Sequence, residues 1–411
     1  MSTDKQNETS SAVAIIGGGP VGLYAALLLG QAGIETHVFE RESHVLQTPR
    51  AAAYFPVTLD EFKKSGIHDD VVNAGFKNTV GVSWRKPKDG GVLAFLGGGD
   101  PDKFAVHLGQ HELSNIILGH LKKYPNVTVR FGTTFVELEE EATKDQVRTH
   151  LLYGPDGTPQ SHVSRFVVAA DGGKSSVRKF LDIPLEGFTW KDFRIVAANI
   201  EYDLENESDW GTASYIVDPE LWSVVAKLGK GPFWRIASSE TLIDGDSTDS
   251  WNEAEGLKWM QRRLAAVLPG NTEKAKIIKL SPYRIHQRCA STFRKGNIVL
   301  AGDAAHLTNP TGGLGLTTGF MDAALLVRVL KQILIDGQSS ALLDFYAETR
   351  RKVFLEYTSP TAIANLLRLK GTDPEVQKER EYYFDSINKR DTEFLINLGE
   401  SELGVSSTWN V

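Results

Sequence analysis

The sequence of 411 residues contains a single cysteine, Cys289, no long apolar run and no excess of basic residues. One cysteine excludes an internal disulfide and a cysteine-rich metal site, and we expect no metal site at all. A membrane span needs roughly 20 consecutive apolar residues, and no stretch approaches that length. The formal net charge is −7, which argues against a nucleic-acid-binding face. The polar start, MSTDKQNETSS, lacks the order of a secretory signal. We therefore expect a cytoplasmic protein in which residues 1–11 form a disordered tail.

What the sequence does contain is a stretch with the order of a dinucleotide-binding unit, AVAIIGGGPVGLYAALLLGQAGIETHVFE. Its first apolar run, Ala12–Ile16, is typical of a buried parallel strand. Gly17, Gly19 and Gly22 follow at G-x-G-x-x-G spacing and open an apolar helical stretch. A second strand ends in Glu40, 23 residues after the first glycine, near the spacing expected of a ribose-binding carboxylate. A glycine-rich turn that binds nothing is the alternative, but the order of strand, helix, strand and acid favours a nucleotide site.

Each of these residues has a physical role in such a site. Gly17 permits the tight turn, Gly19 lets a pyrophosphate approach the backbone, and Gly22 lets helix and strand pack closely. The N-terminus of the helix offers unpaired N–H groups and the positive end of its dipole to the phosphates. Glu40 can accept hydrogen bonds from an adenosine ribose.

Two polar residues in later segments are further candidates for ligand contacts. Arg50 precedes a predicted helix at Thr58–Ser65 and could pair with a pyrophosphate through its planar guanidinium. A solvated surface arginine is an equal alternative. Gln110 starts an amphipathic helix, where a polar side chain can either reach a ligand or remain solvated.

Two aspartates follow predicted strands. Asp171 comes directly after the apolar strand Phe166–Ala170, and Asp303 lies at the carboxyl end of a strand at Asn297–Leu300. Ligands of open α/β sheets bind at the carboxyl ends of the strands, so Asp303 could bind ribose or ribityl hydroxyls. An aspartate that merely caps the next turn is the alternative. A proline-glycine loop and a helix that contains Gly315 follow, and that helix start favours electron-rich groups.

The character of the sequence changes between Leu185 and Ile285. Short runs rich in aromatic and β-branched residues, RIVAANIEY, TASYIV, LWSVVAKL and FWRIAS, predict a largely antiparallel sheet. A helix near Glu253–Leu268 interrupts them. We therefore predict an α/β protein in which an inserted sheet forms the wall of a second substrate's pocket.

Three motifs in this order, GGGPVG with Glu40, AADGGKSSVRK and LAGDAAHLTNPTGGLGL, resemble the single-component FAD-dependent aromatic hydroxylases, typified by para-hydroxybenzoate hydroxylase. The resemblance covers roughly residues 12–360 and is weakest across the inserted sheet. It implies a Rossmann-like FAD-binding domain with an inserted, largely antiparallel substrate domain and C-terminal helices. The implied division is 12–184 and 286–335 for the FAD-binding domain, 185–285 for the substrate-binding sheet, and 336–411 for the C-terminal helical region.

The resemblance also implies roles for individual residues. Gly17, Gly19 and Gly22 would hold the FAD pyrophosphate, Glu40 the adenosine ribose and Asp303 the ribityl chain. Further cofactor contacts are implied for Arg41, Arg50, Gln110, Asp171, Gly313, Leu314, Gly315, Leu316 and Thr317. Pro310 matches the proline whose carbonyl lies near the substrate and the reactive edge of the flavin. His306, which ends GDAAH, is expected to be a packed structural histidine. Thr317 stands where many relatives have Asn, so only a backbone contact to the flavin is implied there.

The implied reaction is hydroxylation of a phenolic or other electron-rich aromatic small molecule. FAD would take hydride from NADPH or NADH, a transient co-substrate, and react with O2 to form a C4a-hydroperoxide. A phenol reacts faster as phenolate, so a base or a stabilising donor should line the pocket. The candidates are Tyr215, Arg235, Tyr283 and His286, of which we favour Tyr215 and Arg235. Ordinary sheet residues are the alternative for each. Oxidative decarboxylation, epoxidation and dearomatising hydroxylation stay open, as does a non-catalytic dinucleotide-binding sensor, whereas the W-x-W-x-I-P signature of flavin halogenases is absent.

Overall fold

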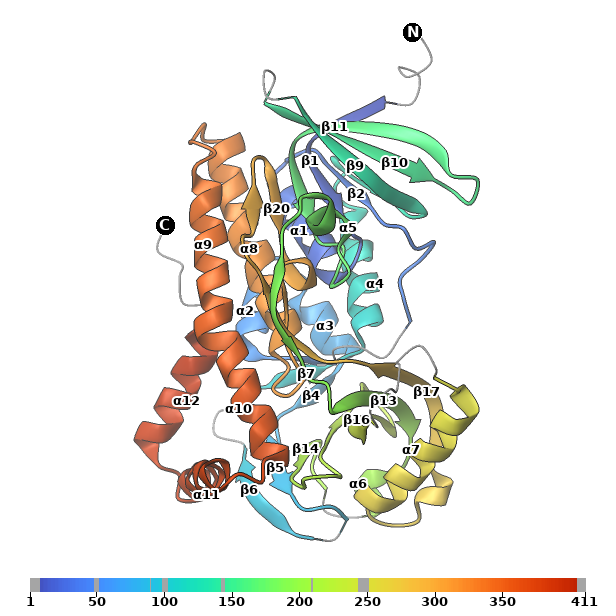
Figure 1. Cartoon of the computed structure of the whole chain (residues 1–411), viewed down its shortest axis with the longest axis vertical. Helices are drawn as coiled ribbons and strands as arrows, with labels where there is room; N and C mark the ends of the chain where they lie inside the picture. The colour runs from blue at the N-terminus through green and yellow to red at the C-terminus, as the bar shows by residue number, and fades with distance from the viewer. Residues whose placement is uncertain are drawn as a thin grey trace.

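The structure is a computed structural model that describes residues 8–47, 52–88, 90–97, 103–141, 145–207, 210–242 and 251–404. The two largest sheets have eight and seven strands. In Figure 1 the eight-stranded sheet lies in the upper half of the molecule and the seven-stranded sheet in the lower half. Helices α9 (Leu342–Val353) and α10 (Ser359–Lys370) run one after the other along one side of both halves. The predicted α/β class is confirmed.

The eight-stranded sheet contains the dinucleotide-binding unit. Its central strands follow the order β20-β11-β1-β2-β8, and all of these pairs are parallel. Strands β1, β11 and β20 each contain a run of consecutive buried residues, as expected where helices cover both faces of a parallel sheet. Its members are β1 (Glu8–Ile16), β2 (Thr36–Phe39), β8 (Val127–Arg130), β9 (Thr133–Glu141), β10 (Gln146–Tyr153), β11 (Thr158–Ala169), β19 (Arg294–Lys295) and β20 (Ile298–Leu300).

The predicted N-terminal tail is too long. Strand β1 begins at Glu8, where it pairs with Ser161 of β11, and not at Ala12. Ser11 also donates to the backbone of Val13 and bonds to the ring of His162. These polar contacts extend the strand beyond its apolar part, while residues 1–7 lie outside the described ranges.

Helices cover the parallel sheet. Helix α1 packs against both α4 and α8, and α8 packs against α9. The helices of this half are α1 (Pro20–Gln31), α2 (Pro56–Lys64), α3 (His68–Ala74), α4 (Gln110–Leu121), α5 (Ser176–Phe180) and α8 (Leu314–Leu334). Helix α1 ends before Gly33, whose φ of 74° stops the helix as expected.

The seven-stranded sheet has the order β17-β13-β16-β15-β14-β5-β6. All its pairs are antiparallel except β14–β5, so the prediction of a largely antiparallel sheet at 185–285 is confirmed. However, two of its strands come from an earlier part of the chain that the sequence did not connect with it. Its strands are β5 (Val82–Arg85), β6 (Val92–Leu96), β13 (Phe193–Glu201), β14 (Ala213–Ile216), β15 (Ser223–Lys227), β16 (Phe233–Thr241) and β17 (Lys276–Tyr283).

The two faces of this sheet are covered differently. One face packs on α7 (Glu253–Val267), through residues such as Trp234 and Ile236. The other face carries Trp84 and Tyr215 and packs against the C-terminal helices. These are α10, α11 (Pro374–Asn388) and α12 (Thr392–Gly404); the short helix α6 (Leu204–Glu207) lies at the end of β13.

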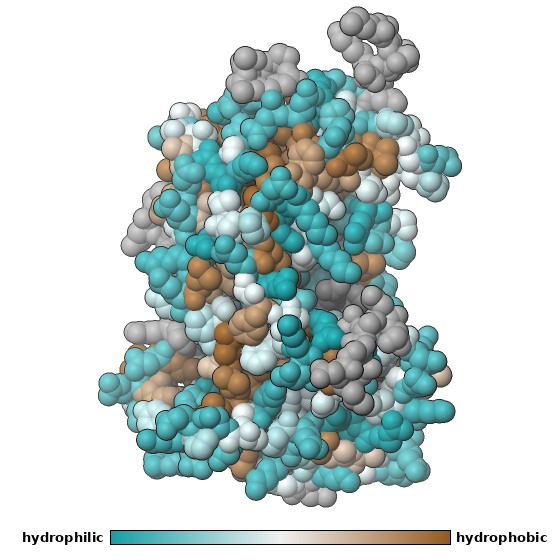
Figure 2. All heavy atoms as spheres, viewed as in Figure 1, coloured by the Kyte–Doolittle hydropathy of each residue, from teal (hydrophilic) through white to brown (hydrophobic). Residues whose placement is uncertain are grey.

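Two small sheets lie between the halves. One joins β12 (Leu185–Thr189), β18 (His286–Ala290) and β21 (His306–Leu307); the other joins β3 (Ala53–Tyr54), β7 (Ala105–His107) and β4 (Phe76–Asn78). The face shown in Figure 2 is largely hydrophilic, with hydrophobic residues in separate patches. None of the described helices combines the length and the apolar character that crossing a membrane requires.

Candidate functional site

The three sequence motifs meet at one edge of the parallel sheet. Strand β11 lies between β1 and β20, with Ala169 paired to Ile16 on one side and to Leu300 on the other. Because parallel strands end at the same edge, Gly17, Asp171 and Asp303 emerge close together there.

Close packing of glycines holds this edge together. A Cβ atom on Gly22 would collide with the carbonyl oxygen of Gly17, and one on Gly319 of α8 would lie 3.3 Å from Cα of Gly302. Gly19 is different, since a Cβ atom there would meet nothing within 4 Å. Gly17 and Gly22 therefore let the elements approach one another, while Gly19 leaves open space at the N-terminus of α1.

Glu40 faces the glycine loop from the end of β2. Its two carboxylate oxygens accept hydrogen bonds from the backbone N–H of Gly18 at 2.6 Å and of Glu42 at 2.8 Å. These bonds orient a half-buried carboxylate beside the start of α1. Arg41 is exposed and lies 3.3 Å from the carboxylate of Glu42. Arg50 lies outside the described residues.

Asp171 caps the helix that follows it with only one of its two carboxylate oxygens. Its Oδ2 accepts from the backbone N–H of Ser176 at 2.7 Å and of Val177 at 3.2 Å. Its Oδ1 is buried and has no hydrogen-bond partner within the described ranges. Gln110 is the half-buried first residue of α4, and its carbonyl accepts a bond from Ser114.

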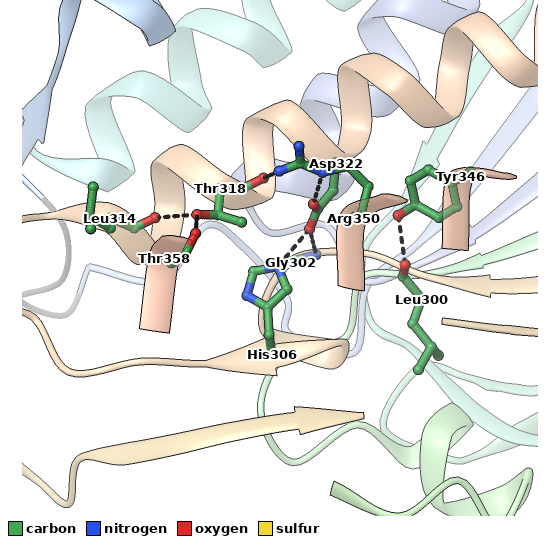
Figure 3. A network of polar contacts seen from close by, with 9 residues as sticks. All are labelled: Leu300, Gly302, His306, Leu314, Thr318, Asp322, Tyr346, Arg350 and Thr358. Carbon is green, nitrogen blue, oxygen red and sulfur yellow. Dashed lines mark hydrogen bonds and ion pairs between the residues drawn. The ribbon is translucent and has the colours of Figure 1, made fainter. Parts of the chain in front are cut away.

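A buried ionic network fixes the turn that carries Asp303 (Figure 3). The carboxylate of Asp322, on α8, accepts from the backbone N–H of Gly302 at 3.0 Å, from Nε2 of His306 at 2.7 Å and from Nε of Arg350 at 2.7 Å. Asp322, His306 and Arg350 are all at most 1% exposed. Asp303 itself is exposed and follows Gly302, whose φ is 61°.

The charges of this network keep the Asp322 carboxyl ionised. Burial works to raise the pKa of the Asp322 carboxyl, but attraction to His306 and Arg350 and their hydrogen bonds outweigh it and hold the pKa below its ordinary value. The ring of His306 also stacks on Phe354, with centroids 4.7 Å apart. His306 is thus a packed, hydrogen-bonded side chain.

The loop after β21 leads into the N-terminus of α8. Gly313 is the N-cap residue with φ 67°, and its N–H donates to the carbonyl of Pro310 at 3.1 Å. The N–H groups of the first turn, from Leu314 through Gly315 and Leu316, have no acceptor inside the helix, as at every helix start. The hydroxyl of Thr317 donates to the carbonyl of Gly313 at 3.2 Å, so this side chain bonds to its own helix.

Arg235 lies on the face of the seven-stranded sheet that is turned away from α7. Its neighbours Trp234 and Ile236 pack on α7, and side chains alternate along a strand. Its Nε donates to Oδ1 of Asn199 on the adjacent strand at 2.6 Å. Burial lowers the pKa of Arg235 to about 10, while Tyr283 and Tyr54 act in the opposite direction. The guanidinium therefore stays protonated at neutral pH.

Tyr215 shares this sheet face but has a different environment. Its ring stacks on Trp84, with centroids 5.7 Å apart. Of the other two candidates, Tyr283 lies on β17 and affects Arg235 electrostatically, whereas His286 is hydrogen-bonded to Thr189 of β12 at 2.8 Å.

Tyr54 of β3 and the adjacent Phe55 relate the Arg235 face to the start of α8: Tyr54 interacts electrostatically with Arg235, and Phe55 lies next to Gly313. The ring of Tyr54 lies 6.4 Å from that of Phe320 on α8, and Phe55 lies so close to Gly313 that a Cβ there would be 2.7 Å from its ring. The hydroxyl of Tyr54 is buried and lacks a hydrogen-bond partner in the part of the chain that the structure describes. Burial raises the pKa of Tyr54 well above its ordinary value, so the phenol is neutral.

Sequence reasoning missed Tyr54, Asp322 and Gln287. An aspartate inside the apolar run of GFMDAALL was a usable signal, because a buried carboxylate needs partners. Nothing local distinguishes Tyr54 or Gln287. Cys289 is buried, which raises the pKa of its thiol to about 12 and leaves it unreactive. No group of three His, Cys, Asp or Glu side chains suited to a metal ion occurs among the described residues.

The observed geometry suits an elongated dinucleotide. The open space at Gly19 adjoins a helix N-terminus, where a pyrophosphate can be held. Glu40 lies on one side of it, and Asp171, with its unpartnered oxygen, and Asp303 lie at the neighbouring strand ends.

Comparison with known proteins agrees with this geometry. The FAD binding domain family matches residues 10–359. The para-nitrophenol 4-monooxygenase of Pseudomonas sp. (strain WBC-3) is 38% identical over 376 residues, which cover 89% of each chain. The 6-hydroxy-3-succinoylpyridine 3-monooxygenase of Pseudomonas putida is 36% identical, over 88% of this chain and 90% of that one.

Solved structures show the same relationship. The crystal structure of p-nitrophenol 4-monooxygenase from Pseudomonas putida superposes with a TM-score of 0.88 at 35% identity, and covers 98% of this chain and 100% of that chain. Aklavinone-11 hydroxylase in complex with FAD and aklavinone shares the fold, with a TM-score of 0.76 at 24% identity over 90% of this chain and 70% of that one. The chain therefore belongs to the FAD binding domain family and is an enzyme of the FAD-dependent aromatic hydroxylase type.

Proposed function

We propose that this enzyme hydroxylates a small phenolic or other electron-rich aromatic compound, with NADPH or NADH as hydride donor and O2 as oxygen source. The observation that carries the proposal is the position of Arg235, a buried cation that interacts electrostatically with Tyr54 of β3 and Tyr283 of β17. Tyr54 in turn lies 6.4 Å, between ring centroids, from Phe320 of α8. The names of the two relatives also point to ring-hydroxylated aromatic substrates.

The residues at the sheet edge would hold FAD. The backbone at Gly19 would take the pyrophosphate, Glu40 the adenosine ribose and Asp303 the ribityl chain, with Gln110, Arg41, Arg50 and Asp171 as further contacts. When bound, FAD would supply the redox chemistry of the reaction, namely acceptance of hydride from NAD(P)H and transfer of one oxygen atom from O2 to the aromatic ring. The helix-start amides of Leu314, Gly315 and Leu316 would favour negative charge on the pyrimidine edge of the flavin.

Arg235 would bind the substrate through its hydroxyl group. A phenol ring is more reactive as phenolate, and a protonated guanidinium lowers the free energy of that anion. The low-polarity surroundings that lower the pKa of Arg235 also strengthen its attraction for an anion. Tyr54, a neutral phenol, would donate a hydrogen bond to the same group. Tyr215, stacked on Trp84, would form an aromatic wall.

Pro310 would lie on the opposite side of the substrate. Its loop joins β21 to the N-terminus of α8, and Phe55, adjacent to Tyr54, contacts Gly313 of this loop. The ring of the substrate would therefore lie between Pro310 and Arg235, where exclusion of water would favour transfer of oxygen to the ring.

The test begins with the purified protein. It should be yellow, or become yellow when reconstituted with FAD, and its oxidation of NAD(P)H should accelerate when a suitable phenol is added. Products formed under 18O2 should carry one labelled oxygen on the ring. A protein that cannot be loaded with flavin would overturn the proposal. Release of CO2 in proportion to NAD(P)H use would replace hydroxylation by oxidative decarboxylation, and reduced enzyme that does not react with O2 would indicate a sensor.

A further inference from the structure

Gln287 has a buried side-chain amide that is not among the proposed cofactor and substrate contacts. It is the second residue of β18 and is 4% exposed. Its Oε1 accepts from the backbone N–H of Asn309 at 2.7 Å, from Nδ2 of Asn309 at 3.0 Å and from the hydroxyl of Thr308 at 3.1 Å. Its Nε2 donates to the hydroxyl of Ser359 at 2.9 Å and to the carbonyl of Ser359 at 3.3 Å.

These bonds use the whole hydrogen-bonding capacity of the amide. A glutamine side chain offers one carbonyl oxygen and two N–H donors, and here the oxygen and both donor positions have partners. Satisfying every group of a buried amide gives it one orientation, because any other leaves a buried polar group unpaired. Gln287 thus fixes three segments relative to one another: β18, the loop after β21 and the start of α10.

The network continues around Pro310. Asn309 is fully buried, and its Oδ1 accepts from the backbone N–H of Thr311 at 3.0 Å and also from the hydroxyl of Thr311. That hydroxyl lies 3.3 Å from the carbonyl of Ala362 on α10. Pro310 is therefore held on both sides by residues whose side chains are bonded to one another or to neighbouring elements.

The loop needs such a clamp because its own backbone is permissive. Gly312 and Gly313 have φ values of 103° and 67°, and glycine moves readily between such conformations. The same loop sets the start of α8.

Gln287 also lies close in sequence to the substrate face. Strand β17 ends at Tyr283, which acts electrostatically on Arg235, and β18 begins at His286. The short connection between β17 and β18 therefore links Tyr283, near the proposed substrate site, with Gln287, which holds the Pro310 loop.

We propose that Gln287 is a positioning residue that sets the distance between the ring of the substrate and the Pro310 side of the flavin site. This inference rests on the proposed function. If the clamp is loosened, hydride and O2 are still consumed, but less of the oxygen reaches the ring and more is released as H2O2, with the electrons of NAD(P)H reducing O2 to peroxide.

The test compares Gln287→Met, which keeps the side-chain length but removes every hydrogen bond, with wild type, both loaded with FAD. Amide hydrogen exchange in peptides that cover 308–316 should become at least about tenfold faster, since loop opening no longer breaks the bonds to Gln287. The yield of product per NAD(P)H should fall at least twofold, with H2O2 accounting for the difference. The change that the substrate causes in the flavin absorption spectrum should also be altered.

A matched control and a milder variant keep the test decisive. Tyr202→Phe removes another buried hydrogen bond, to the carbonyl of Pro269 at 2.8 Å, in the seven-stranded half, and should change neither loop exchange nor product yield. Ser359→Ala removes one acceptor of Gln287, and should give a smaller change of the same kind if Gln287→Met fails to load FAD. The inference would be overturned if Gln287→Met showed the same exchange rate in 308–316 and the same product yield as wild type. If Gln287→Met fails to load FAD, the same result in Ser359→Ala would overturn it. If wild type makes no hydroxylated product, the proposed function fails, while the exchange measurement still decides the role of Gln287.

Discussion

Replacing Asp322 by asparagine should destabilise the protein strongly, although the two side chains have nearly the same shape. The change removes the negative charge opposite Arg350, which is 1% exposed and donates to Asp322 at 2.7 Å. Breaking a buried ion pair by removing one partner costs about 3–5 kcal/mol, because the other charge stays buried without compensation. Asparagine retains one acceptor oxygen, so we expect a loss of about 3 kcal/mol.

The assay is urea-induced unfolding of the FAD-free protein, followed by tryptophan fluorescence. Asp385→Asn is the matched control, since Asp385 pairs with Lys389 at 3.1 Å on the surface, with side chains 68% and 74% exposed. An exposed pair of this kind contributes about 0–1 kcal/mol, so the control should unfold almost like wild type. A loss below about 1 kcal/mol for Asp322→Asn would refute the reasoning that the buried charges depend on each other.

The dependence on pH gives a second check. The pKa of Asp322 is lowered in the folded protein, so its stabilisation is complete above the pKa of the unfolded chain, about 4, and disappears as the pH falls through the folded pKa. Titration of Asp322 itself should therefore not change the difference between wild type and Asp322→Asn from pH 5 to 8. The difference should shrink only in more acidic solution, where wild type itself loses the charge. A difference that varies across neutral pH would assign the effect to another group.

Three further predictions concern the cofactor and the substrate. Gly19→Ala should fold normally but bind FAD at least about tenfold more weakly, or ~1.4 kcal/mol, because the added methyl group meets no protein atom but occupies the proposed phosphate space. In Gly22→Ala the added methyl group would collide with the backbone of the glycine loop, so this variant should be less stable than wild type in addition to binding FAD weakly. Equal melting temperatures for Gly19→Ala and Gly22→Ala would contradict this distinction. Glu40→Gln should raise the dissociation constant of FAD about tenfold, as measured by flavin fluorescence, through loss of charge-assisted bonds; unchanged affinity would remove Glu40 from the site. Arg235→Met should raise the dissociation constant of a phenolic substrate by about 10- to 100-fold with little effect on FAD, whereas Arg194→Met, on the same sheet and paired with Glu240, should leave substrate binding unchanged.

The parts of the site that depend on local spacing could be predicted from sequence. The glycine motif and Glu40 lie within one strand–helix–strand unit, whose geometry is the same wherever it occurs. The structure places Asp171 and Asp303 at the same sheet edge, as parallel strand ends require.

The parts that depend on tertiary packing could not be predicted. The closeness of Tyr54 to Arg235 arises only when β3 packs between the two halves. The bonds of Gln287 join segments that are 22 and 72 residues away along the chain. No periodicity or motif carries such information. The predicted FAD-binding domain at 12–184 includes β5 and β6, yet their pairing places them in the other sheet.

That pairing has a consequence for how the protein forms during synthesis. The hydroxyls of Ser83, on β5, and Ser214, on β14, are hydrogen-bonded although they lie 131 residues apart. At about 5–20 residues per second, the ribosome needs on the order of ten seconds to make the intervening chain. Throughout that interval β5 and β6 form at most a lone hairpin with an unpaired edge, which is marginally stable and prone to pair with other chains. A nascent chain should therefore bind chaperones most strongly before β14 emerges.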